Sequence, residues 1–268
     1  MLHYLGYLAA VFIGLALGIM GGGGSILTVP ALVYLLGVSP VQSTAYSLFI
    51  VGSTSLVGAA GYFRKGLVAL PTALVLLLPS LVVVFLTRRV LLPAIPHELF
   101  TVGSLVFTKD LLVLLAFAGL MVAAATSMIR HSAPEAALPR LPAPNYALVL
   151  GIGAVVGFLT GFVGAGGGFL IIPALVLGAR LPMKMAVGTS LTIIALNSLI
   201  GFSGDLSAGR AIDWGFLLGF LAFALGGIVL GTRLAPLIPG ARLKPAFGWF
   251  TLAMGTFILA KELLFPHH

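Results

Sequence analysis

Two glycine-rich segments are the parts of this 268-residue chain best suited to chemistry. They read GGGGSILTVPALV at 21–33 and GAGGGFLIIPALV at 164–176. Glycine lets the backbone approach a ligand closely, and each segment leads into a short apolar run that predicts a helix. A helix N-terminus carries about half a positive charge and N–H groups that lack intrahelical partners, so it can bind an anion. The predicted substrate-binding residues of these turns are Gly22, Gly23, Gly24, Ser25, Gly166, Gly167 and Gly168.

Hydroxyl and amide side chains inside two apolar runs, 43–62 and 185–203, form a second candidate set. Helical spacing of three or four places several of them on one side, where they could line a pathway. The alternative is hydrogen bonding between helices or to the preceding turn, worth about 0.6 kcal/mol on average in membranes. The members of this set are Thr44, Ser47, Ser55, Thr189, Ser190, Asn197 and Ser198.

Glycine also has a packing role, because small residues let membrane helices approach closely. We expect that role for the G-x-x-x-G pairs Gly14 with Gly18, Gly157 with Gly161, and Gly215 with Gly219. Clustered glycines would weaken a helix by about 1 kcal/mol each relative to Ala, which makes a poor packing face. For the clusters at 21–24 and 164–168 we therefore favour contact with a ligand.

Composition restricts the protein class. The chain is 60% hydrophobic and 7% charged, with a mean hydropathy of +1.21, whereas a soluble domain has about 25% charged residues. The lipid bilayer is its expected partner, and soluble dinucleotide-binding enzymes, nucleic-acid binders and disulfide-rich secreted folds are excluded. The chain has no Cys, so thiol chemistry and cysteine-based metal sites are excluded too. No catalytic residue, metal ligand or cofactor is predicted.

Charged residues lie outside the apolar runs or at their ends. The six carboxylates follow this pattern, which argues against a cation pump with a buried carboxylate relay. The 14 Lys and Arg residues also follow it, so we expect them to set membrane topology. A second role, drawing anions toward a cavity mouth, is open to Arg64, Lys65, Arg88, Arg89 and Arg233.

The apolar runs form two sets of five, separated by the proline-rich segment 131–145. The second run of each set has roughly a dozen residues, too few for the ~20 that a spanning helix needs. We expect an all-α polytopic membrane protein with a first transmembrane repeat at 1–130, a linker at 131–145 and a second repeat at 146–268. The two His residues at 267–268 are compatible with a tag remnant.

The two halves resemble each other. Shifting the sequence by 143 residues matches 16 of 46 positions between 21 and 66, including Pro30 with Pro173 and Ser55 with Ser198. An odd number of crossings per half would invert the second repeat, and this places nine Lys and Arg on one side and five on the other. The positive-inside rule then puts the amino terminus outside a plasma (inner) membrane. If only the short run is re-entrant, the repeats are parallel and the split is eight against six.

Two segments are similar to enzyme motifs but lack the partner residues or elements that those motifs need. GFSG at 201–204 is similar to the serine motif of rhomboid proteases, but no His lies inside an apolar run to act as base. GIGAVVG at 151–157 lacks the spacing and preceding strand of a dinucleotide-binding motif. No enzymatic activity is expected.

The duplicated G-x-G-G-G-x-x-x-x-P-x-L pattern, each copy followed by a small-polar helix ending in G-x-x-G, resembles the sulfite exporter TauE/SafE family, also called the toluene-sulfonate uptake permease family. The resemblance implies a transporter of sulfur-containing anions such as sulfite, sulfonates or sulfoacetate. Carried over to this chain, the motif implicates Gly23, Gly24 and Pro30, with Gly166, Gly167 and Pro173.

We therefore expect a secondary transporter that binds a small anionic substrate at two half-helix N-termini near the membrane midplane and moves it by alternating access. One alternative is a channel or facilitator for another small anion. Another is a membrane enzyme or assembly factor without flux.

Overall fold

The computed structural model describes residues 2–102, 105–130, 146–164, 166–179 and 181–264. The linker 131–145 and the two His residues at 267–268 therefore lie outside the described residues. The first half consists of α1 (Leu2–Met20), α2 (Gly23–Pro30) with a π-helical turn (Ala31–Leu35), α3 (Pro40–Arg64), α4 (Leu70–Leu86) with a π-helical turn (Thr87–Leu91), α5 (Leu92–Ala94), β1 (Glu98–Val102), β2 (Leu105–Thr108) and α6 (Lys109–Arg130). The second half consists of α7 (Tyr146–Val163), α8 (Gly168–Pro173) with a π-helical turn (Ala174–Gly178), α9 (Met183–Ser207), α10 (Trp214–Leu234) with a 3-10 turn (Ala235–Leu237), and α11 (Gly240–Leu264). Strands β1 and β2 form an antiparallel hairpin between α5 and α6.

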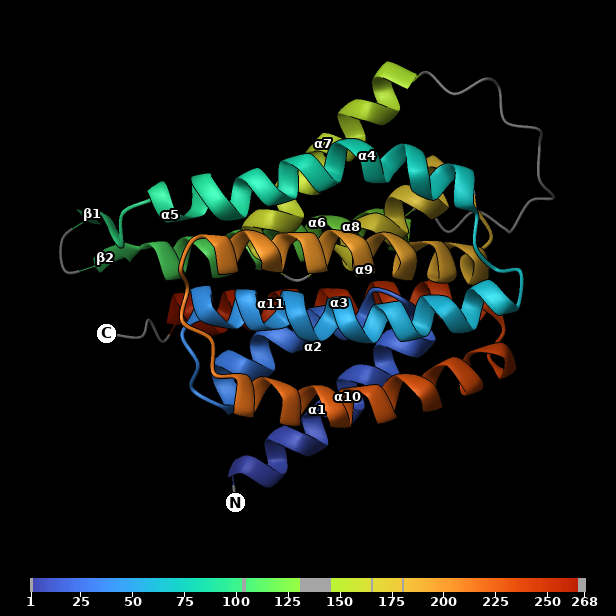
Figure 1. Cartoon of the computed structure of the whole chain (residues 1–268), viewed down its shortest axis with the longest axis horizontal. Helices are drawn as coiled ribbons and strands as arrows, with labels where there is room; N and C mark the ends of the chain where they lie inside the picture. Colours follow the sequence, from blue (N-terminus) through green and yellow to red (C-terminus); the bar gives the residue numbers. More distant parts are fainter. Residues whose placement is uncertain (1, 103–104, 131–145, 165, 180, 265–268) are drawn as a thin grey trace.

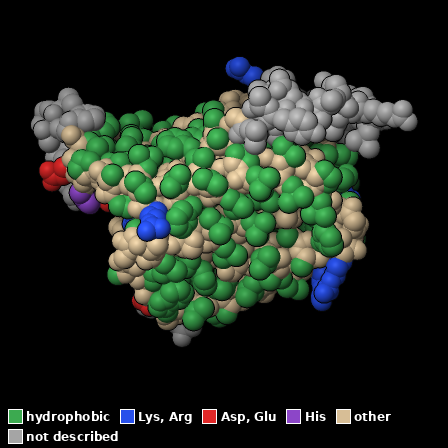
Figure 2. Space-filling model, turned by 45° about the horizontal axis from the view of Figure 1, so that its top comes forward, with side chains coloured by type: hydrophobic (Ala, Val, Ile, Leu, Met, Phe, Trp, Pro, Cys, Tyr) green, Lys and Arg blue, Asp and Glu red, His purple; other side chains and the backbone are tan. Residues whose placement is uncertain are grey.

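Within the described residues, six helices are long and apolar enough to cross a membrane. Large hydrophobic side chains on their outer faces are exposed, among them Leu78, Val82 and Trp249, and the face in Figure 2 is mostly hydrophobic. Exposed apolar surface of this extent suits contact with lipid. The predicted all-helical, polytopic membrane fold is confirmed. The six spans run over Pro40–Arg64, Leu70–Ala94, Lys109–Arg130, Met183–Ser207, Trp214–Leu237 and Gly240–Leu264.

Helices α3 and α9 form the centre of the bundle. They lie side by side and run in opposite directions (Figure 1). Both are strongly buried, with 61% and 72% of their apolar windows inside the protein. Small residues at the contact permit this closeness, since a Cβ added to Gly52 would lie 3.0 Å from Leu199.

The first helix of each half packs against the other half. Helix α1 lies along α10, and α7 lies along α4. A Cβ added to Gly18 would lie 2.8 Å from the carbonyl oxygen of Ile228, and one added to Gly157 would lie 2.7 Å from the Cα of Ser80. The packing role predicted for Gly14, Gly18, Gly157 and Gly161 is thus confirmed.

The third predicted glycine pair behaves differently. Cβ atoms at Gly215 and Gly219 would meet side-chain atoms no closer than 3.5 and 3.4 Å, which is ordinary contact. The prediction of close packing through this pair was wrong. On the same helix, Gly227 and Gly231 take that role instead, since Cβ atoms there would overlap the backbone of α1.

The short helices α2 and α8 each end at a proline followed by a π-helical turn. Pro30 and Pro173 occupy these ends. Proline has no N–H and clashes with the carbonyl four residues back, so regular helical bonding cannot continue through it. The short runs therefore remain half-helices.

Candidate functional site

The glycine turns precede the half-helices and use backbone conformations that favour glycine. Gly21 follows α1 with φ +70°, and Gly164 follows α7 with φ +72°. Gly166 and Gly167 also have positive φ, +66° and +68°. Side chains are strained in this region, which explains why glycine stands here. Gly22 has φ −94°, so the two turns differ in detail.

The two turns meet each other. Gly22 and Gly168 are both buried, and a Cβ added to Gly168 would lie 2.6 Å from the Cα of Gly22. The same Cβ would lie 3.2 Å from the hydroxyl oxygen of Ser25. The first residues of α2 and α8, distant in sequence, therefore share one location inside the protein.

Helices α3 and α9 provide the surroundings of the turns. A Cβ added to Gly21 would lie 2.7 Å from the Ser190 hydroxyl of α9. One added to Gly166 would lie 2.8 Å from the Ser198 hydroxyl of the same helix. Gly164 packs against Thr44 of α3. The structure thus brings three members of the predicted hydroxyl set, Thr44, Ser190 and Ser198, into contact with the glycine turns.

Several buried hydroxyl groups on the helices around the turns have no hydrogen-bond partner among the described residues. They belong to Ser47 and Ser55 of α3, Ser198 of α9 and Thr160 of α7. Thr160 was not predicted, but it lies against Gly167. Leaving a buried hydroxyl unpaired costs about 1–3 kcal/mol, so each is a candidate donor or acceptor for a ligand.

Other members of the predicted set have partners within the protein. The Ser25 hydroxyl donates to the carbonyl of Gly22 (2.7 Å), and that of Ser190 donates to the carbonyl of Val187 (2.9 Å). The Thr189 hydroxyl accepts from the N–H of Ala69 (2.9 Å), just before α4. These bonds are local or structural, as the alternative interpretation of the hydroxyl set expected.

Asn197 joins two helices. Its Oδ1 accepts a hydrogen bond from the Ser80 hydroxyl of α4 (2.9 Å). Its Nδ2 is buried and has no partner among the described residues. Asn197 therefore has an interhelical bond and still has donors to offer.

Two of the predicted glycines face neighbouring helices. A Cβ at Gly24 would overlap the carbonyl oxygen of Ile13 and lie 2.5 Å from Leu17 of α1. A Cβ at Gly167 would overlap the Thr160 hydroxyl of α7. Close helix packing explains glycine at both positions, so their part in binding stays a prediction. Gly23 is the first residue of α2.

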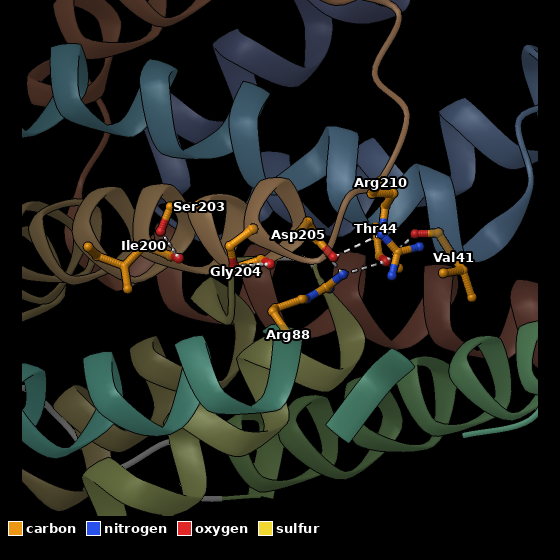
Figure 3. A network of polar contacts seen from close by, with 9 residues as sticks. Val41, Thr44, Arg88, Ile200, Ser203, Gly204, Asp205 and Arg210 are labelled. Carbon is orange, nitrogen blue, oxygen red and sulfur yellow. Dashed lines mark hydrogen bonds and ion pairs between the residues drawn. The ribbon is translucent and has the colours of Figure 1, made fainter. Parts of the chain in front are cut away.

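Sequence reasoning missed a buried ionic cluster beside the second turn. Arg88 has a fully buried side chain, and its Nη1 donates to Thr44 Oγ1 (3.0 Å) and to Asp205 Oδ2 (3.2 Å). Arg210 Nε lies 3.0 Å from Asp205 Oδ1, which makes an ion pair without good hydrogen-bond alignment. Figure 3 shows Arg88 reaching from its helix toward Asp205 and Thr44.

Arg88 follows the apolar run 67–87 directly, as expected for Lys and Arg at run ends, but its expected role in setting topology does not account for its complete burial. The apolar run ends at residue 87, but the helix continues through a π-helical turn to Ala94. Arg88 therefore lies inside a spanning segment, where only tertiary contacts can supply a counter-charge. The sequence offered one signal, the polar pair Thr87 and Arg88 at the end of an apolar run.

Metal chemistry finds no support in the described part of the chain, where no group of three or more His, Cys, Asp or Glu side chains could hold an ion. The one buried acidic group at the turns, Asp205, is paired with arginines.

The model of the family described as "Sulfite exporter TauE/SafE" matches residues 6–258. The chain belongs to the sulfite exporter TauE/SafE family. It is 28% identical over 254 residues to a "Probable membrane transporter protein" of Xylella fastidiosa strain 9a5c, covering 92% of this chain and 91% of that protein. It is also 27% identical to "Probable membrane transporter protein YunE" of Bacillus subtilis, covering 86% and 89%. No solved structure matches the chain.

Membership of the TauE/SafE family settles the broad class. The family and its relatives are described as membrane transporters, not enzymes. The protein is therefore a multi-pass membrane transporter, and the enzyme alternatives are set aside.

Proposed function

We propose that this TauE/SafE transporter moves small sulfur-containing anions, such as sulfite, sulfonates or sulfoacetate, by alternating access. One observation carries the proposal: the two glycine turns that precede α2 and α8 are buried and meet at Gly22 and Gly168. An anion there would receive N–H donors from two helix N-termini at once. We place this site near the membrane midplane, as in other secondary transporters.

The unpaired hydroxyls support an anionic ligand. Ser47, Ser55 and Ser198 are buried and without partners among the described residues, and Ser198 lies directly against the second turn. Hydroxyl groups can donate to sulfonate or sulfite oxygens, and such bonds to a charged acceptor are strong. We assign the other predicted binding residues to the same proposed site as predictions: Gly23, Gly24, Ser25, Thr44, Gly166, Gly167, Thr189, Ser190 and Asn197.

We also propose that residues 1–130 and 146–268 are inverted repeats. Their pairing supports this, since α1 packs on α10 where α7 packs on α4. The contacts of the turns are exchanged between the halves as well. Gly21 contacts Val187 of the second half, and the equivalent Gly164 contacts Thr44 of the first half. Under the 143-residue shift, Thr44 is the equivalent of Val187. The opposite directions of α3 and α9 (Figure 1) fit a two-fold axis in the membrane plane. Rocking of one half against the other would then open the site to each side in turn.

Orientation follows from charge. Arg64 and Lys65 lie at the C-terminal end of α3, and Lys184 lies at the N-terminal end of α9. Because the two helices are antiparallel, these ends lie on the same side of the protein, and that side is basic. We propose that this side faces the cytoplasm of a bacterial-type inner membrane and that the amino terminus is outside.

The decisive experiment is flux in proteoliposomes. Purified protein in liposomes should take up radiolabelled sulfite with saturable kinetics, and methanesulfonate should compete. Protein-free liposomes provide the background. Conductance that rises linearly with sulfite concentration would indicate a channel and contradict alternating access. Absence of any flux or competition by sulfur anions, together with uptake of acetate, would contradict the proposed substrate class.

A further inference from the structure

The guanidinium of Arg88 has one occupied edge and one free edge. Its Nη1 donates to Thr44 Oγ1 and Asp205 Oδ2, at 3.0 and 3.2 Å. Its Nε and Nη2 are buried and have no partner among the described residues. Arg88 is therefore a buried cation that still has hydrogen-bond donors to give.

The free donors lie on one side of the guanidinium plane. The Nε–H and one Nη2–H bond point in the same direction and form the fork that binds two oxygens of a carboxylate, phosphate or similar group. The contacts to Thr44 and Asp205 hold the opposite side. Arg88 is thus oriented by the protein, and the fork formed by Nε and Nη2 has no hydrogen-bond partner among the described residues.

This edge lies at the second glycine turn. A Cβ added to Gly164 would overlap Arg88 Nη2, so only the absence of a side chain at Gly164 leaves room for the guanidinium. The left-handed conformation of Gly164, φ +72°, also favours glycine. The same turn continues to Gly166, which lies against Ser198. The free edge and the proposed binding site therefore share one backbone segment.

The charges of the cluster do not cancel. Asp205 is fully buried and is paired with both Arg88 and Arg210. Two guanidinium groups on one carboxylate leave one positive charge in excess. Buried charge is costly unless it is paired, so this location favours a bound anion.

Under the 143-residue shift, the positions that match Arg88 and Asp205 are Gly231 and Tyr62, which carry no charge. Gly204 of α9 packs against Arg88, whereas Gly61 of α3, its equivalent, lies near Thr232. Asp205 is likewise matched by Tyr62, whose hydroxyl donates to the carbonyl of Gly18 (3.0 Å). The buried cation Arg88 thus lies at the second turn. One anion bound between the two turns would have Arg88 as its charge partner.

We infer that Arg88 is a specificity-determining residue of this transporter, binding two oxygens of an oxyanion such as sulfite or a sulfonate at the Gly164 turn. This inference rests on the proposed function. It adds to that function a fixed charge partner for the anion. It also adds a preference for oxyanions, which offer two oxygens to the fork, over a spherical halide.

The structural alternative is that Arg88 only neutralises Asp205. The two roles differ in their effect on selectivity. Lysine at position 88 keeps the charge but lacks the fork. If Arg88 is only a counter-ion, Arg88→Lys will leave the preference for sulfite over chloride unchanged.

The test is equilibrium binding to purified protein, with sulfite, methanesulfonate and chloride as probes, for wild type, Arg88→Lys and Arg89→Lys. Arg89 is the matched control because it is the adjacent residue, is exposed and stacks its guanidinium over Phe85. We expect Arg88→Lys to weaken sulfite and methanesulfonate binding at least tenfold and chloride binding less than threefold. Arg89→Lys should leave all three unchanged.

Equal affinities in wild type and folded Arg88→Lys would overturn the inference and leave the proposed function standing. Wild-type protein that binds none of the sulfur anions would overturn both. If Arg88→Lys does not fold, crystals of wild type soaked with selenite decide the matter. An anomalous peak within hydrogen-bond reach of Arg88 Nε and Nη2 supports the inference, and a peak elsewhere contradicts it.

Discussion

Gly22 and Gly168 are in backbone contact: a Cβ on Gly168 would lie 2.6 Å from the Cα of Gly22. The contact joins the first turns of two half-helices from different halves of the chain. In the proposed alternating-access cycle, movement of one half relative to the other would act on the point where the two glycine turns meet. This is the relationship that a transporter with a central site between two halves requires.

The contact predicts the effect of adding one methyl group at position 168 on stability and uptake. Gly168→Ala should favour the helical state of α8 by about 1 kcal/mol, but overpacking against Gly22 should cost about 1–3 kcal/mol. We expect a lower thermal melting temperature in detergent and at least a tenfold loss of sulfite uptake in proteoliposomes. Gly178→Ala is the matched control, since its Cβ would meet nothing within 4 Å. Wild-type uptake by Gly168→Ala would contradict the proposed tight meeting of the turns.

The unpaired Ser198 hydroxyl predicts opposite changes in stability and affinity. Ser198→Ala removes a buried hydroxyl that has no partner among the described residues, so the free energy of unfolding should stay the same or rise by up to about 1 kcal/mol. Sulfite binding should weaken by about 1 kcal/mol, roughly fivefold. Thermal melting and binding titrations measure the two effects. Ser203→Ala is the control on the same helix, because that hydroxyl donates to the Ile200 carbonyl. Unchanged affinity in Ser198→Ala would assign Ser198 to packing.

Asp205 predicts a large stability effect. Asp205→Asn leaves Arg88 and Arg210 without their shared counter-charge, and breaking a buried pair in this way costs about 3–5 kcal/mol. Asp213→Asn is the control, since Asp213 accepts from the N–H of Phe216 at the start of α10 and Asn caps helices equally well. Thermal denaturation of both variants without ligand checks this. Similar melting temperatures for the two variants would mean that water reaches the cluster and screens it.

The cysteine-free sequence allows a clean test of topology. Arg64 ends α3 and Ala208 follows α9, and because the two helices run in opposite directions these ends lie on opposite sides (Figure 1). In intact cells, a membrane-impermeant maleimide should label Ala208→Cys and not Arg64→Cys. Permeabilised cells, in which both should react, are the control. The reverse pattern would place the amino terminus inside.

The sequence by itself determined the membrane class, the helical fold and the family, because composition and apolar run length respond to lipid whatever the tertiary arrangement. It also indicated the two glycine turns, since positive φ and close approach restrict the residue type at Gly21 and Gly164 regardless of their neighbours. Which glycines face other helices, as Gly24 does, was decided by tertiary packing.

Only the tertiary structure brought Arg88, Asp205 and Thr44 together. They lie on three different helices, far apart in the chain, and local sequence does not encode a distance between helices. The same reason explains why no pattern separated Ser198, which is unpaired, from Ser190, which bonds the preceding turn. Hydrogen bonding of a buried side chain depends on the atoms packed around it, and these come from every part of the chain.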